Sequence, residues 1–349
     1  MVKCFAVENS LTIDTDGSIK PCCKFIGKFG NVYQDKINTE KFKNLNNKIW
    51  PVGCAKCKIA EDNNVSSRRQ RYETRFRDND FLLDLSMGNY CNLKCRMCNE
   101  KLSTKWYSDA RKLGRTVPKS TVLSKQDIDK IFDNIPKDKN ITIELKGGEP
   151  LVSPNIEYVF DKADALNCKI ICITNGTVMP DWFIDRLQYM NIELNVSIDG
   201  TQDTYEYVRG DKIFTWQDCL NRIQYLENLD IESSRIWYNY VVQNLTIDSM
   251  LEFENLVSKK INWIILTDPS YLSCNILPDE NKNNIVNKLL QLTTCPNGLV
   301  DLFLKKCDDE LYKKFIIESQ KLDKLRNQNL KIVAPYLLNK FGENLYDSV

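Results

Sequence analysis

The sequence contains no histidine in its 349 residues. This absence removes the side chain that most often transfers protons near neutral pH and binds metal ions. A zinc site with His ligands, a Ser-His-Asp triad and a Cys-His dyad are therefore excluded. An excess of charge of one sign is lacking as well, with 48 Lys and Arg against 47 Asp and Glu. Bulk charge thus gives no reason to expect a nucleic acid or an anionic membrane as a partner.

Long hydrophobic runs are also missing. No stretch approaches the roughly 18 apolar residues of a membrane span, and the first residues do not show the basic and apolar regions of a signal peptide. We therefore expect a cytoplasmic protein with no membrane partner. In such a reducing compartment, clustered cysteines are more often metal ligands than disulfides.

The chain does contain 14 cysteines, and eight of them fall within the first 98 residues. These eight form two groups with different spacings. We expect the remaining six, which are scattered singly, to be small buried apolar side chains. They are Cys168, Cys172, Cys219, Cys274, Cys295 and Cys307.

From residue 81 onward, short β-rich runs alternate with amphipathic helical stretches. Strands are predicted at 81–87, 141–145, 169–174, 191–198, 235–242 and 262–267, with helices near 101–113, 124–135, 155–166, 180–190, 214–228 and 247–260. Six successive βα units predict an α/β fold with a parallel sheet, too few for a closed eight-stranded barrel. We expect a partial, open (β/α)6 barrel of the TIM type, with a doubly wound sheet as the alternative. Its chemistry belongs at the carboxyl ends of the strands.

Composition divides the chain into three parts. Residues 1–78 are rich in Cys, Lys and Asn and poor in apolar residues. Because its apolar core is small, we expect this module to need additional stabilisation, which its cysteines can supply. Residues 79–275 form the predicted barrel, and residues 276–349 are predicted to be a helical extension. We interpret the basic stretch 66–77 as a connector between module and barrel. The alternative is a docking site for an acidic peptide or a phosphate backbone.

The first cysteine group follows the first predicted barrel strand, with the spacing C-x3-C-x2-C. Cys91, Cys95 and Cys98 place three thiols on one short loop. Three thiolates can hold three irons of a [4Fe–4S] cluster and leave the fourth iron open for a ligand. Zinc would require a fourth ligand nearby, and no histidine exists to provide it.

This loop, together with motifs at later strand ends, resembles the radical S-adenosylmethionine (radical SAM) superfamily over about residues 80–270. Gly147, Gly148 and Glu149 match the GGEP motif of the family, which receives the amino group of SAM. Asn175 lies in a Thr-Asn-Gly turn that matches a family turn near the ribose. The resemblance implies that these residues contact SAM.

Further SAM contacts are implied by the same resemblance. Ser197 and Arg209 match positions that contact the carboxylate and the ribose, and Thr267, within 266–269, lies where family members flank the adenine. Met97 stands where the family often has an aromatic residue, so its backbone is expected to contact the adenine with less stacking surface.

The resemblance also implies the chemistry. An external one-electron donor, such as flavodoxin or ferredoxin, reduces the cluster, and SAM is cleaved to a 5′-deoxyadenosyl radical that abstracts hydrogen from a substrate. Because histidine is missing, any proton transfer falls to Cys, Tyr, Lys, Asp or Glu. The candidates near predicted strand ends are Tyr205, Tyr207, Tyr271 and Cys274, for which a structural role is favoured over a catalytic one.

The second cysteine group combines a Gly-x4-Cys segment with a C-x2-C knuckle. It resembles a SPASM or twitch module, which implies an auxiliary [4Fe–4S] cluster. The expected ligands are Cys4, Cys22, Cys54 and Cys57, with Cys23 competing with Cys22; a four-cysteine zinc site is the alternative. In most family members this module follows the barrel, whereas here it precedes it. We expect it to fold back against the carboxyl ends of the strands.

The substrate is inferred by analogy alone. The auxiliary module favours a peptide or protein, and hence peptide modification or maturation. The alternatives are a radical SAM reaction on a small molecule or nucleotide, and a metal-stabilised binding protein without catalysis.

Overall fold

The structure is a computed structural model that describes residues 3–45, 50–62, 66–209 and 213–348. Its centre is one eight-stranded sheet with the order β2-β1-β3-β4-β5-β6-β7-β8. All neighbouring strands are parallel except the antiparallel pair β1 and β2. The strands are β1 (Ser10–Ile13), β2 (Ile19–Lys20), β3 (Asp80–Ser86), β4 (Asn140–Lys146), β5 (Lys169–Thr174), β6 (Ile192–Ser197), β7 (Ile236–Val242) and β8 (Lys260–Ile265).

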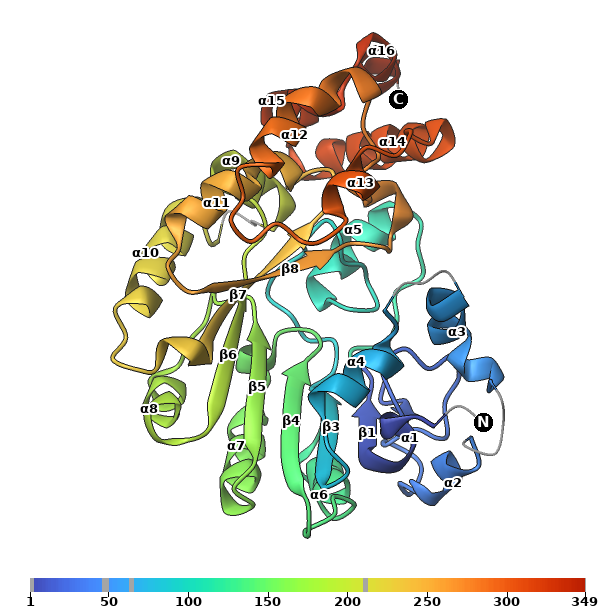
Figure 1. Cartoon of the computed structure of the whole chain (residues 1–349), viewed down its shortest axis with the longest axis vertical. Helices are drawn as coiled ribbons and strands as arrows, with labels where there is room; N and C mark the ends of the chain where they lie inside the picture. The colour runs from blue at the N-terminus through green and yellow to red at the C-terminus, as the bar shows by residue number, and fades with distance from the viewer. Residues whose placement is uncertain (1–2, 46–49, 63–65, 210–212, 349) are drawn as a thin grey trace.

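Helices follow the strands from β3 onward (Figure 1). Those between strands are α5 (Tyr107–Lys112), α6 (Lys125–Phe132), α7 (Ile156–Ala165), α8 (Asp181–Tyr189), α9 (Gln202–Val208), α10 (Trp216–Glu227) and α11 (Met250–Leu256). The N-terminal helices are α1 (Phe5–Asn9), α2 (Glu40–Lys43), α3 (Ala55–Asp62) and α4 (Arg68–Arg75). The C-terminal helices are α12 (Lys282–Leu289), α13 (Leu299–Phe303), α14 (Asp309–Arg326), α15 (Leu330–Val333) and α16 (Lys340–Ser348).

The predicted α/β fold class is confirmed. Each of the six predicted strands overlaps one of β3 to β8, and the sheet is open, because among the described strands β2 and β8 end the order without pairing. Helix α9 was not predicted, since seven residues are too short to show a clear helical period.

The N-terminal segment extends this sheet, which the sequence did not indicate. Strand β1 runs parallel to β3, with Ser10 opposite Leu82 and Ile13 opposite Leu85. A four-residue strand that pairs with a partner 72 residues away, as Ser10 does with Leu82, gives too weak a local pattern to be recognised. The module therefore extends the sheet beyond β3 through β1 and β2. The domain boundaries at 78 and 275 stay predictions.

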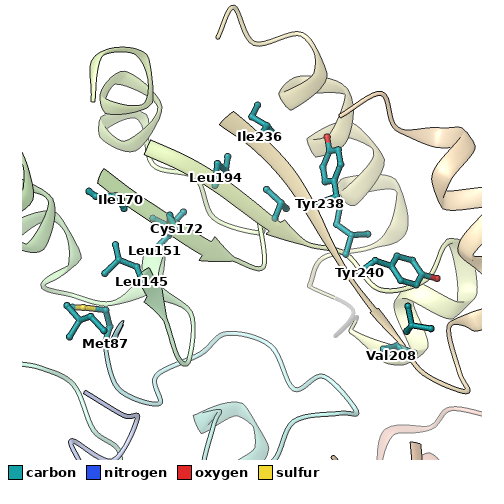
Figure 2. Packing of buried hydrophobic residues seen from close by; sticks show 14 of the residues in the cluster. Met87, Leu145, Leu151, Ile170, Cys172, Leu194, Val208, Ile236, Tyr238 and Tyr240 are labelled. Carbon is teal, nitrogen blue, oxygen red and sulfur yellow. The ribbon is translucent and has the colours of Figure 1, made fainter. Parts of the chain in front are cut away.

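The two faces of the sheet have different partners, because side chains alternate along a strand. One face packs its apolar residues against the helices, and Figure 2 shows Leu145, Cys172, Leu194 and Tyr238 from the consecutive strands β4 to β7. On the opposite face, Leu82 packs with residues of α1 and α4 in a second, smaller apolar cluster. In that cluster the Phe5 and Phe76 rings stack with centroids 4.9 Å apart.

This second cluster corrects the expected placement of the module. Helices α1 and α4 lie against the face of β3 that is turned away from α6 and α7, and not on the carboxyl ends of the strands (Figure 1). The turn between β1 and β2 reaches the carboxyl edge, where the Thr15 carbonyl accepts a hydrogen bond of 2.6 Å from the Thr121 hydroxyl. Within the described ranges, no helix combines the length and apolar character needed to cross a membrane.

Candidate functional site

The first cysteine loop lies directly after β3, at the carboxyl edge of the sheet. Cys95 is buried, whereas Cys91 and Cys98 are half-buried. The Cys95 carbonyl accepts hydrogen bonds from the Cys98 amide (3.0 Å) and from the Trp106 indole (2.9 Å). These bonds fix a tight turn that points its three thiols into one region.

The electrostatics of these thiols show that the structure brings them together. Burial, and then the neighbouring Cys95, raises the pKa of Cys91 to about 12. A hydrogen bond with the Cys98 thiol lowers the pKa of Cys95, and the nearby Arg209 also lowers it. Metals bind cysteine as the thiolate, so the binding of a metal cluster to this loop would release protons.

The donor set fits an iron–sulfur cluster. In the part of the chain that the structure describes, no three Cys, Asp or Glu side chains converge closely enough to hold a single metal ion. A [4Fe–4S] cluster makes a different demand, since each thiolate binds a different iron. Three thiols on one loop are the soft ligands that such a cluster takes.

The glycine pair after β4 packs beneath the cysteine loop. Gly147 and Gly148 both have positive φ, at +78° and +55°. A Cβ on Gly147 would collide with the Ser86 hydroxyl, and one on Gly148 would collide with the Tyr90 carbonyl. Only glycine fits both the dihedral angles and the space, so this loop can approach its neighbours at backbone distance.

Glu149 is buried and joins two strand ends. Its carboxylate accepts hydrogen bonds from the Thr174 hydroxyl (2.6 Å) and the Leu151 amide (3.1 Å) on one oxygen, and from the Asn175 amide (2.6 Å) on the other. Burial raises the pKa of this carboxyl group. Each carboxylate oxygen can accept two bonds, so one acceptor position stays available for an ammonium group.

A polar network links the same region to the cysteine loop. The Asn175 side-chain amide donates to Asn92 at 2.9 Å, and Asn92 donates to the Thr177 hydroxyl at 2.7 Å. Asn92 lies between the first two cysteines of the loop. The turn after β5 is thereby fixed next to the expected cluster.

Arg209 occupies the centre of the site, but its guanidinium is already engaged. Its Nε forms an ion pair at 3.2 Å with the fully buried Asp199 carboxylate, and its Nη1 donates a hydrogen bond to the Ser197 carbonyl. The sequence did not identify Asp199, although it directly follows the strand that ends at Ser197. Arg209 is therefore a buried cation beside Cys95 and Glu149 as well as a candidate SAM contact.

The remaining predicted site residues differ in their surroundings. Met97 is half-buried and packs against the main core, Ser197 ends β6, and Thr267 is exposed two residues beyond β8. The roles implied for them stay predictions. Tyr205, Tyr207 and Cys274 are buried in the main core, which favours the structural role expected for them.

The four cysteines expected to bind the auxiliary cluster come from separate segments and line one cavity. Cys4 precedes α1, Cys22 follows β2, and Cys54 and Cys57 lie around the start of α3. Burial, and then the nearby Cys4 and Cys57, raises the pKa of Cys54 to about 11. Four thiols around one cavity fit a [4Fe–4S] cluster by donor chemistry.

Cys23 points elsewhere. Its sulfur accepts a hydrogen bond of 3.4 Å from the Arg68 guanidinium, and it is not among the residues that line the cavity. The structure therefore favours Cys22 over Cys23 as the fourth ligand.

This choice predicts the effect of two adjacent substitutions. Cys22→Ala should lose the auxiliary cluster, about half of the bound iron, because one of its four ligands is gone, whereas Cys23→Ala should keep it. Iron and acid-labile sulfide measured after anaerobic reconstitution check this expectation. Equal iron loss in both variants would mean that the ligand set is wrong.

The C-terminal helices contribute residues that sequence reasoning missed. Arg96, inside the cysteine loop, forms a buried ion pair with Asp323 of α14; the two side chains are 2% and 3% exposed. The Tyr207 ring centroid lies 3.5 Å from the Arg96 guanidinium carbon, and the Tyr207 hydroxyl donates to Asp323 at 3.1 Å. Helix α14 therefore anchors the loop that carries Cys95.

The fold and the site define a class of protein: an open parallel barrel with a three-cysteine loop and a glycine-rich turn at its carboxyl edge. Comparison with family models agrees. Residues 85–257 match the Radical SAM superfamily model, and residues 4–58 match SPASM, an iron-sulfur cluster-binding domain. The chain belongs to the radical SAM superfamily and carries a SPASM domain before its barrel, as the resemblance predicted.

Individual relatives are distant. The chain is 26% identical over 219 residues to the uncharacterized protein MJ0907 of Methanocaldococcus jannaschii. This match covers 59% of this chain and 70% of that protein. It is 29% identical over 153 residues to a GTP 3′,8-cyclase of Synechocystis, covering 43% of this chain and 41% of the cyclase.

Solved structures with similar folds are also distant. A structure of anSMEcpe with bound AdoMet and a Kp18Cys peptide has a TM-score of 0.42 at 15% identity, covering 72% of this chain and 62% of that one. Streptococcus suis SuiB bound to its precursor peptide SuiA has a TM-score of 0.38 at 16% identity, covering 66% of this chain and 44% of that one.

Proposed function

We propose that this protein is a radical SAM enzyme that modifies a peptide or protein and uses two [4Fe–4S] clusters. Cys91, Cys95 and Cys98 would hold the catalytic cluster. Cys4, Cys22, Cys54 and Cys57 would hold the auxiliary one. When bound, the first cluster and SAM supply one-electron cleavage of SAM and hydrogen abstraction from a substrate. A small electron-transfer protein such as flavodoxin or ferredoxin would deliver the electron.

One observation carries this proposal: two separate sets of thiols gather around two regions of the same sheet. One set lies at the carboxyl edge beside Glu149, and the other lines a cavity together with Ala6 and Tyr72, which also pack against Leu82 of β3. The chain's own groups then bind and orient SAM. Gly147 and Gly148 allow close backbone approach, Glu149 offers an acceptor to the ammonium group, and the buried Arg209 places positive charge beside the cysteine loop.

The auxiliary module supports a peptide or protein as substrate, because it matches SPASM and its helices α1 and α4 pack on one face of the sheet at β3. A nucleotide is the second candidate, favoured by the partial match to a GTP 3′,8-cyclase. Incubating the reduced enzyme and SAM with GTP, or with a small peptide encoded beside the gene, separates the two. A mass change of the peptide would support the first candidate, and consumption of GTP would support the second.

The number of clusters is tested by anaerobic reconstitution. Two [4Fe–4S] clusters predict about eight irons and eight sulfides per chain. About four irons with one zinc would instead mean that the N-terminal cysteines form a zinc site.

Glu149→Gln is expected to weaken SAM binding by about 10- to 150-fold, since a hydrogen bond to a charged group contributes about 1.5–3 kcal/mol. The variant should keep its core iron, because Glu149 is not a cluster ligand. The Gln amide would also face the Asn175 amide, so a modest loss of stability is expected. Equilibrium SAM binding measures the effect, and an unchanged dissociation constant would move the SAM site elsewhere.

A further inference from the structure

A group of charges lies between the auxiliary cavity and the barrel. Its carboxylates, Asp84 and Glu144, are buried, Lys146 and Arg68 are partly buried, and Arg75 is exposed. Lys146 contacts Asp84 at 2.5 Å, and Glu144 has Lys146, Arg68 and Arg75 within 3.7–3.8 Å. Asp84 and Glu144 stand on neighbouring strands, on the face that receives α4. Three cations thus share two carboxylates, which leaves an excess of positive formal charge on this side of the cavity.

Arg68 is the member of this group that reaches the cavity. It begins α4, which is fixed by a capping box at Ser67, and it lines the cavity together with the four cysteines. Its nearest carboxylate contact, at 3.8 Å to Glu144, is too long for a hydrogen bond. Its Nε is buried and has no hydrogen-bond partner within the part of the chain that the structure describes.

A buried guanidinium N–H without an acceptor is costly, and it points to a partner from outside the chain. The other cations of the lining differ. Arg69 is neutralised by Glu61 at 2.6 Å and by Glu73 at 2.7 Å, and Lys24 is exposed to solvent, which screens its charge.

We propose that Arg68 is a positioning residue for the auxiliary cluster: it donates a hydrogen bond to the cluster and stabilises its reduced form. This inference rests on the proposed auxiliary cluster. A cluster held by four thiolates is negatively charged and becomes more so on reduction. A desolvated cation and a hydrogen bond to sulfur therefore raise its reduction potential.

The test uses the full chain with Cys91, Cys95 and Cys98 all changed to Ala, so that only the auxiliary cluster is present. EPR-monitored redox titration then gives its midpoint potential. Arg68→Met should shift the midpoint to a more negative value. Lys24→Met, which also removes one cation from the lining, should leave it nearly unchanged. An unshifted midpoint in Arg68→Met, with full iron content, would overturn the inference.

If Arg68→Met fails to hold its cluster, Arg68→Lys decides the question. This variant keeps the charge but loses the planar donor group, so a midpoint more negative than that of the parent supports the inference and an unchanged midpoint overturns it. If the parent variant binds zinc or no iron, both this inference and the auxiliary cluster fail. SAM cleavage by the wild-type protein would then still support the catalytic cluster.

Discussion

Cys95→Ala is expected to reduce SAM cleavage to the background rate. Cys95 is the buried thiol at the centre of the loop, and without it only two protein ligands remain for the catalytic cluster. The fold should persist, because the loop lies at the edge of the sheet and Cys95 is not part of the main apolar core. The measurement is 5′-deoxyadenosine formed after anaerobic reduction, with circular dichroism as the check on folding.

Cys168→Ala is the matched control. Cys168 is also buried, but it belongs to the main core, so its substitution should keep SAM cleavage. If Cys95→Ala forms 5′-deoxyadenosine as fast as Cys168→Ala, the catalytic cluster has been assigned to the wrong cysteines.

Asp323→Asn is expected to lower the free energy of unfolding by about 3–5 kcal/mol, because it leaves the Arg96 guanidinium buried without its counter-charge. The Asp323 carboxylate also accepts hydrogen bonds from the Tyr207 hydroxyl and from the Leu330 amide, the latter at 2.8 Å. Since Arg96 lies next to Cys95, we also expect less iron bound at the catalytic site. Denaturant unfolding and iron content measure the two effects.

Asp347→Asn provides the comparison for this variant. Asp347 pairs with Lys331 at 2.7 Å, but both side chains are substantially exposed, so removing this charge should cost about 0–1 kcal/mol. Equal unfolding free energies for the two variants would mean that α14 does not anchor the cysteine loop.

The strands of the barrel could be predicted because each is a run of apolar and β-branched residues bounded by turns. KIICIT, for example, coincides with β5 at Lys169–Thr174. Strand β1 could not be predicted, because its pairing with β3 depends on contacts distant in sequence. The same reason hid Asp323, which lies 227 residues from its partner Arg96.

The candidate site shows a similar division. The spacing of Cys91, Cys95 and Cys98 was sufficient to predict a shared loop, because a short spacing fixes the possible geometry. Spacing could not distinguish Cys22 from Cys23, since adjacent residues differ only in the direction of their side chains. The structure distinguishes them through Arg68, which contacts Cys23. The pairing of Arg209 with Asp199 likewise required coordinates.

The measurement that tests the central claim most directly is the product formed by the wild-type protein. After anaerobic reconstitution, the protein is incubated with SAM and a strong one-electron reductant, and 5′-deoxyadenosine is quantified. A radical SAM enzyme predicts 5′-deoxyadenosine that depends on both SAM and reductant. A fully iron-loaded protein that binds SAM but forms no 5′-deoxyadenosine would contradict the account and indicate a metal-stabilised binding protein.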